Sequence, residues 1–153
     1  MSSPSVARNG SIEVRLGPED RHLLGQVPDL LASVGAEPDD PAYPVLHRDA
    51  HPDDAEATAR FDELVAGERS AGRRIDRGVV ETVADGAETL SRMEGLSLLR
   101  SLNEARLALA ARRGAFEEGS SWERQAATDP ALAAVAWMSS LQVSLIRAID
   151  RLG

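Results

Sequence analysis

The chain of 153 residues contains no cysteine, which excludes disulfides, thiolate metal sites and cysteine nucleophiles. Lysine is also missing, so all 17 basic residues are arginine. Aromatic residues make up only 3% of the chain against 42% for hydrophobic residues as a whole, so leucine, valine and alanine must fill the core. An aliphatic core favours helix packed on helix over an aromatic-filled β sandwich.

Long hydrophobic runs and a basic surplus are missing too. No apolar stretch approaches the roughly 18 residues of a membrane span, and the N-terminal residues lack the pattern of a signal peptide. We therefore expect a cytoplasmic protein with no membrane partner. The net charge of −8 repels nucleic acid at long range, so direct DNA binding would need a segregated basic face.

The apolar pattern indicates one domain. Residues 1–5 are predicted to form a disordered tail and residues 6–153 a single helical domain. The expected fold is mainly α, with orthogonal or bundle-like packing of about five helices and a short N-terminal β-hairpin. A chain of this length buries roughly 70% of the surface that its unfolded state exposes, which is enough for a core without metals or disulfides.

The hairpin is predicted from the residues that open this domain. Asn9-Gly10 favours the positive φ angles of a type I′ turn, and Ile12, Val14 and Leu16 then alternate with charged residues. Because a two-stranded ribbon is marginally stable alone, we expect it to lie on the helices.

Helical spacing of apolar residues then continues along the chain. The first helix is predicted to begin at Pro18 and to be kinked or split at Pro28, and residues 36–52 to form an ordered loop. Helix is expected again from residue 53, and a further apolar stripe covers residues 75–90.

Two long helices are predicted to close the chain. Ser91 and Glu94 have the spacing of a capping box, so a helix begins there and ends at Gly114. Residues 115–128 are expected to form a loop. Asp129-Pro130 then begins the last helix, which continues almost to the C-terminus.

Arg106 is the most informative polar residue of these helices. At 100° per residue it falls inside the apolar arc that includes Leu98, Leu102 and Leu109. An arginine there must be paired or must reach water, because an unpaired buried charge is costly. It grips an anionic ligand or a partner's carboxylate, or it forms an internal salt bridge that fixes helix register. The internal salt bridge is the favoured interpretation.

Gln142 has a comparable place on the last helix, between Ile149 and Val135 on the helical wheel. It either lines a polar pocket with Arg106 or bonds a buried backbone group, and the second interpretation is favoured. Both residues are expected where the last two helices press their leucine faces together.

Arg69, Arg73 and Arg77 align at i, i+4 and i+8 and form the only plausible basic stripe. A nucleic-acid face would look like this in miniature, and a docking face for an acidic protein is another alternative. Asp76 and Glu81 are close enough to pair with Arg73 and Arg77 on a helix. The stripe is therefore interpreted as a solvated, salt-bridged face.

Metal and catalytic patterns are weak. His47 and His51 have the i, i+4 spacing of a zinc-binding pair, but Pro44 and Pro52 flank them and interrupt a helix. No phosphate loop, nucleophile elbow or pair of carboxylates in opposed environments is recognisable. We therefore expect no metal, no cofactor and no enzymatic activity.

Four stretches of the chain resemble, in order, the actinobacterial domain-of-unknown-function family two thousand and seventeen, which includes actinomycete oxidative-stress transcriptional regulators. They are residues 11–16 leading into residues 23–24, residues 39–61, the segment SLNEARLALAARRG at 101–114 and the segment WMSSLQVSLIRAI at 137–149. The matching positions include Asn103, Arg106, Leu107 and Gln142.

The resemblance implies a small, mostly helical regulatory protein that acts through a protein partner, in transcription. Two features depart from the family: thiol switching cannot operate without cysteine, and Ala110 stands where the family has a glycine. The leading hypothesis is thus a protein-binding regulator. Second comes a binder of small anions at Arg106 and Gln142, and third a direct DNA-binding regulator. Self-association through the last helix, giving a homodimer, is also open.

Overall fold

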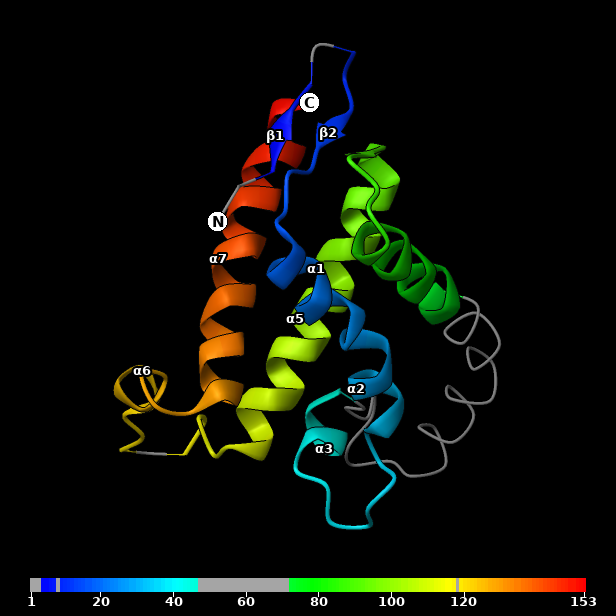
Figure 1. Cartoon of the computed structure of the whole chain (residues 1–153). Coiled ribbons are helices and arrows are strands. Elements are labelled where there is room, and N and C mark those ends of the chain that lie inside the picture. Colours follow the sequence, from blue (N-terminus) through cyan, green and yellow to red (C-terminus); the bar gives the residue numbers. More distant parts are fainter. Residues whose placement is uncertain (1–3, 8, 47–71, 118) are drawn as a thin grey trace.

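The computed structural model describes residues 4–7, 9–46, 72–117 and 119–153 (Figure 1). These residues are mainly helical, as predicted, with a small antiparallel sheet at one end. The elements are β1 (Ser5–Val6), β2 (Ile12–Glu13), α1 (Pro18–Gly25), α2 (Val27–Ser33), α3 (Ala42–Leu46), β3 (Thr89–Leu90), α5 (Arg92–Arg112), α6 (Trp122–Gln125) and α7 (Pro130–Arg151). Residues 72–84 form a further helix between α3 and β3.

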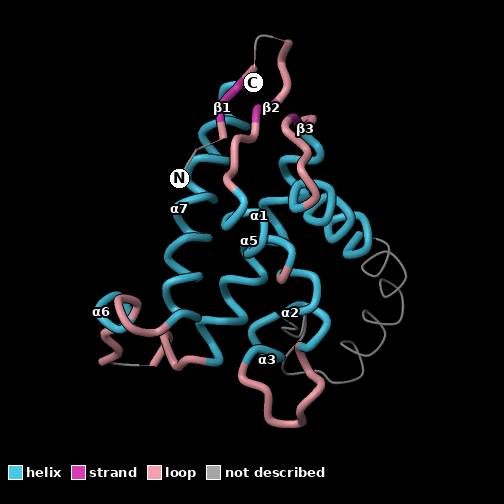
Figure 2. Tube along the Cα trace, viewed as in Figure 1, coloured by secondary structure: helices cyan, strands magenta, loops and turns pink. Residues whose placement is uncertain are grey.

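The sheet has three strands in the order β1-β2-β3 (Figure 2). Ile12 is opposite Val6 on one side and opposite Leu90 on the other, and both pairings are antiparallel. The predicted hairpin is therefore confirmed, whereas β3 replaces the end of the helical stripe expected up to Leu90. The first strand begins at Ser5, one residue before the expected boundary of the domain.

The turn of the hairpin differs from the prediction. Gly10 has a φ of +79°, but no residue other than glycine has a positive φ among the described residues. A type I′ turn at Asn9-Gly10 needs positive φ at both positions, so that prediction is wrong. Gly10 alone supplies the left-handed conformation that the turn requires.

The first predicted helix is split near Pro28. α1 ends at Gly25 and α2 begins at Val27, with Pro28 in the first turn of α2, where its missing N–H breaks no helical hydrogen bond. Within the expected loop at 36–52, residues 42–46 form the short helix α3, so the loop prediction is wrong there. Residues 47–52 lie outside the described residues.

The capping box at the start of α5 is confirmed. The Ser91 Oγ atom accepts from the Glu94 N–H at 3.1 Å, and Glu94 Oε1 accepts from the Ser91 N–H at 2.9 Å. At the other end Gly114 has a φ of +67°, which ends the helix in a left-handed cap. The expected loop at 115–128 contains one short helix, α6.

The core lies where α5 and α7 run antiparallel against each other (Figure 1). Leu98 and Leu102 of α5 and Leu145 of α7 have no exposed surface. Burying one such side chain stabilises the fold by about 1.5–3 kcal/mol. Ile75, expected on an apolar stripe, is 64% exposed, so its place in the core prediction is wrong.

α7 is unusually apolar for a helix that has one side in the core and the other side exposed to solvent. An 18-residue window within it has a mean hydropathy of 1.5, and 39% of that window is buried inside the structure. By length and composition alone α7 is long and apolar enough to cross a membrane, whereas no membrane-spanning segment was expected from the sequence. The core helix of a soluble protein can have the same length and the same apolar composition.

Candidate functional site

Asn103 and Arg106 lie nearly one turn apart on α5. The Arg106 Nη2 atom donates a hydrogen bond to Asn103 Oδ1 at 2.9 Å. Both residues are half-buried, which agrees with the inward position that the helical wheel gave Arg106. The Nε atom of Arg106 is shielded from solvent and has no hydrogen-bond partner among the residues that the structure describes. A buried donor without an acceptor costs about 1–3 kcal/mol, so an acceptor at this place would stabilise the protein.

The register of α5 and α7 brings Gln142 to within about one residue of the level of Asn103 along the helix axes. A Cβ atom built on Gly95 would lie 3.6 Å from Ile149 Cγ1, so these two positions are level. The two helices are antiparallel and rise equally per residue. Eight residues beyond Gly95 on α5 is Asn103, and eight residues before Ile149 on α7 is Leu141. Asn103 is therefore level with Leu141, the residue next to Gln142. We call Asn103, Arg106 and Gln142 the seam cluster. No hydrogen bond joins Gln142 to the other two in the described part of the chain.

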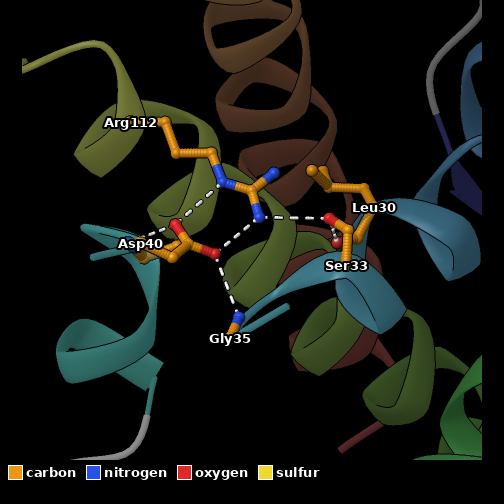
Figure 3. Close-up of polar contacts among 6 residues, drawn as sticks. Leu30, Ser33, Gly35, Asp40 and Arg112 are labelled. Carbon is orange, nitrogen blue, oxygen red and sulfur yellow. Dashed lines mark hydrogen bonds and ion pairs between the residues drawn. The ribbon is translucent and has the colours of Figure 1, made fainter. Parts of the chain in front are cut away.

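Arg112, six residues further along α5, has a very different environment (Figure 3). Its Nε donates to Asp40 Oδ1 at 3.1 Å, and its Nη2 donates to Asp40 Oδ2 at 2.8 Å and to Ser33 Oγ at 3.1 Å. The N–H groups of Gly35 and Ala42 each donate to the same carboxylate at 3.0 Å. The Arg112 guanidinium, followed by these amides, holds the pKa of the buried Asp40 carboxyl well below its usual range.

Asp40 and Arg112 were not among the site residues predicted from the sequence. One local signal was present, since an aspartate that accepts from the N–H two residues later forms an Asx turn, which is typical of Asp-Pro segments. The partner could not be found in the same way, because Arg112 is 72 residues away in the sequence. This network ties the α2–α3 connection to the end of α5 and leaves no oxygen of Asp40 unbonded.

The basic stripe is also used within the fold. Asp76 was expected to pair with Arg73 on its own helix, but it is buried and binds Arg100 of α5 through two hydrogen bonds of 2.8 and 3.0 Å. The pKa of Glu104 on α5 is raised by its burial. Arg73 and Arg77, which are half-buried, act in the opposite direction and reduce this rise. Both arginines therefore lie near enough to α5 to act on Glu104, and the predicted solvated, salt-bridged face stays a prediction.

Arg21 of α1 is satisfied by main-chain groups. Its Nε donates to the Leu16 carbonyl at 3.1 Å, and its Nη1 donates to the carbonyls of Val83 and Ala87, the latter at 3.2 Å. A cation at these carbonyls stabilises the C-terminal end of the helix over 72–84. Arg21 thus has a structural role.

Three other predicted candidates lie outside the described residues: Arg69, His47 and His51. Within the described ranges no group of three or more histidine, aspartate or glutamate side chains could hold a metal ion.

Two open cavities lie elsewhere on the surface. One of about 600 Å³ lies between α1 and the end of the helix over 72–84, and Arg21 and His22 contribute to its wall. Another of about 450 Å³ lies beside the α2–α3 connection, and Arg112 contributes to it. Neither cavity is lined by a residue of the seam cluster, so the polar pocket predicted around that cluster does not coincide with either.

Comparison with known protein families shows to which family the chain belongs. The model of DUF2017, a domain of unknown function, matches residues 2–149. The chain belongs to this family. No curated protein and no solved structure matches it. The resemblance to a domain-of-unknown-function family is thereby confirmed, whereas the actinobacterial origin and the kinship to oxidative-stress regulators stay predictions.

In this DUF2017 protein Arg106 differs from Arg21, Arg100 and Arg112 in what it binds. Each of those three donates to a carboxylate or to main-chain carbonyls. Among the described residues Arg106 donates only to the neutral amide of Asn103. An amide oxygen satisfies one N–H group but does not neutralise a guanidinium charge, so the seam cluster can accept an anion.

Proposed function

We propose that this DUF2017 protein is a non-enzymatic regulator that binds a partner protein, and that its seam cluster receives an acidic side chain of that partner. The observation that carries the proposal is the half-buried charge of Arg106, which has no carboxylate partner among the described residues. A planar guanidinium recognises a carboxylate through paired hydrogen bonds. Transcriptional regulation is the setting that the family resemblance implies, and we adopt it together with the cytoplasmic location expected from the sequence.

The charges of the protein favour a protein partner over nucleic acid. The net charge is −8, and Arg73 and Arg77 are half-buried beside α5. A nucleic-acid face needs several free cations on one surface, because phosphate contacts supply most of the affinity. A single guanidinium is enough for one carboxylate in a protein interface.

Replacing Arg106 by glutamine is expected to weaken partner binding roughly 30-fold, because truncating one member of a part-buried charge pair costs about 2 kcal/mol or more. The measurement is quantitative affinity capture from native lysate with Arg106→Gln beside Arg92→Gln, a matched exposed arginine at the start of α5. Proteins retained by the wild type and by Arg92→Gln should be lost with Arg106→Gln. Equal retention by all three chains would contradict the proposal.

A second candidate function is the binding of a small anion by the same cluster. The Arg106 Nε atom lacks an acceptor among the described residues, and an oxygen of a small anion would supply one. Citrate and inorganic phosphate are suitable probes because both present several oxygen acceptors to a guanidinium.

Citrate is expected to raise the melting temperature of the wild type, since a ligand that binds only the folded state stabilises it by about 2.7 kcal/mol at a hundred times its Kd. The shift, measured by differential scanning fluorimetry at constant ionic strength, should disappear in Arg106→Gln and persist in Arg92→Gln. The same shift in all three chains would mean a general salt effect and would remove this candidate.

A further inference from the structure

The outer side of α7 lacks charge over most of its length. No charged residue occurs from Pro130 to Ile146, yet Val143 and Ile146 are 48% and 44% exposed. A helix on the surface of a soluble protein normally presents charged or polar residues to water. The stripe at the centre of this outer side is made of the exposed residues Ala133, Ala136, Ser140, Val143, Arg147 and Asp150, which we call the α7 stripe.

The spacing of the α7 stripe fits a helix as its cover. Its positions alternate three and four residues apart, which is the a/d repeat that keeps one side of a helix against another helix. Alanine and serine at three of these positions allow the backbones to approach closely. We propose that a second copy of this chain covers the stripe, with the two α7 helices packed antiparallel across a twofold axis.

Charge decides the direction of this pairing. In the register that pairs all six positions, Asp150 of each copy is opposite Ala133 of the other, so this charge meets an uncharged position of the stripe. Arg147 is opposite Ala136 in the same register. A parallel pair would instead place Arg147 on Arg147 and Asp150 on Asp150, and such like-charge contacts are unfavourable.

The same pattern selects a second copy over an unrelated protein. An isologous interface needs a surface that complements itself. The α7 stripe meets this condition because its uncharged centre, Ser140 and Val143, lies against the same two residues of the other copy. The charged residues Arg147 and Asp150 of each copy then lie against the uncharged residues Ala136 and Ala133 of the other. The net charge of −8 on each copy opposes association, so added salt should strengthen the dimer by screening the repulsion.

Sedimentation equilibrium of the full chain tests the proposal. The wild type is expected to have twice the mass of the chain, and Val143→Glu should weaken the dimer at least tenfold because it buries a charge at the centre of the stripe. Ile75→Glu is the control, since Ile75 is 64% exposed on another helix, and it should leave the dimer unchanged. A monomeric wild type, or equal weakening by both variants, would overturn the proposal.

Single cysteines test the antiparallel register, and the chain has no cysteine of its own to interfere. Ala136→Cys and Arg147→Cys should form an intermolecular disulfide when mixed and oxidised. Ala136→Cys alone should form none, because its two copies would be about 16 Å apart along the helix axes. A disulfide in Ala136→Cys alone would overturn the antiparallel arrangement. A monomer that sediments with phosphatidylcholine vesicles would overturn the dimer in favour of a lipid surface.

Discussion

Gly95→Val is expected to lower the free energy of unfolding by about 1–3 kcal/mol, the usual effect of overpacking a buried site. A Cβ atom at Gly95 would lie 2.5 Å from Ile12 Cδ1 and 3.6 Å from Ile149 Cγ1. Ile12 has no exposed surface, so its side chain has no open space into which it could turn. Urea denaturation followed by circular dichroism measures the loss.

Two further variants separate this contact from a general effect of valine on a helix. Gly78→Val is the matched control, because Gly78 is also helical and nothing lies within 4 Å of an added Cβ atom there. Ile12→Val removes the Cδ1 atom and should recover part of the loss in the Gly95→Val chain, although alone it costs about 0.5–1.5 kcal/mol. Equal losses at Gly95 and Gly78 would contradict the contact.

Arg112→Met is expected to lower the urea midpoint of unfolding further than any other exchange of an arginine for methionine on α5. It keeps most of the apolar stem but leaves the buried Asp40 carboxylate without its cation. Arg113→Met is the control at the next position, because Arg113 is half exposed and its contact with Asp129 is 3.6 Å long. Similar midpoints for the two variants would show that the Asp40 network contributes little.

Acid should remove the same contribution in the wild type. The pKa of Asp40 is lower in the folded protein than in the unfolded chain, so the unfolded chain binds more protons as the pH falls. The stabilisation is therefore complete above the ordinary aspartate pKa of about 3.9 and is lost as the pH falls below it. Arg112→Met should show a shallower loss of stability in this range, because only the two backbone amides would still hold the pKa down.

The long helices were predictable because their signals are local. The capping box of Ser91 and Glu94 and the glycine at 114 depend on a few neighbouring residues, and both appear as expected. The division at Pro28 follows in the same way from one missing N–H group. Such features survive tertiary packing because no distant residue competes with them.

The remaining features depend on distant residues. β3 has two residues, too few for an alternating pattern, and it exists because Leu90 pairs with Ile12. α3 is placed by Asp40, whose cation comes from the far end of α5. Asp76 pairs with Arg100 of another helix, so its nearest arginine in sequence was the wrong partner.

The site was predictable only in its position. The helical wheel gave Arg106 and Gln142 inward places, and both are half-buried near the α5–α7 contact. Whether Arg106 had an internal carboxylate could not be deduced from one helix, because any carboxylate would come from another element. The favoured interpretation was an internal salt bridge, and within the described residues that prediction is wrong.

The three-stranded sheet sets an order for biosynthesis. β2 is translated well before β3, so the edge of β2 that pairs with β3 has no partner until Thr89 and Leu90 have been translated. Pairing β2 with β3 closes a loop formed by all the residues between them, and this costs entropy before the strands pair. Until then the β1–β2 hairpin lacks its third strand. A nascent chain arrested before residue 89 should therefore expose Ile12 to proteases that the finished protein resists.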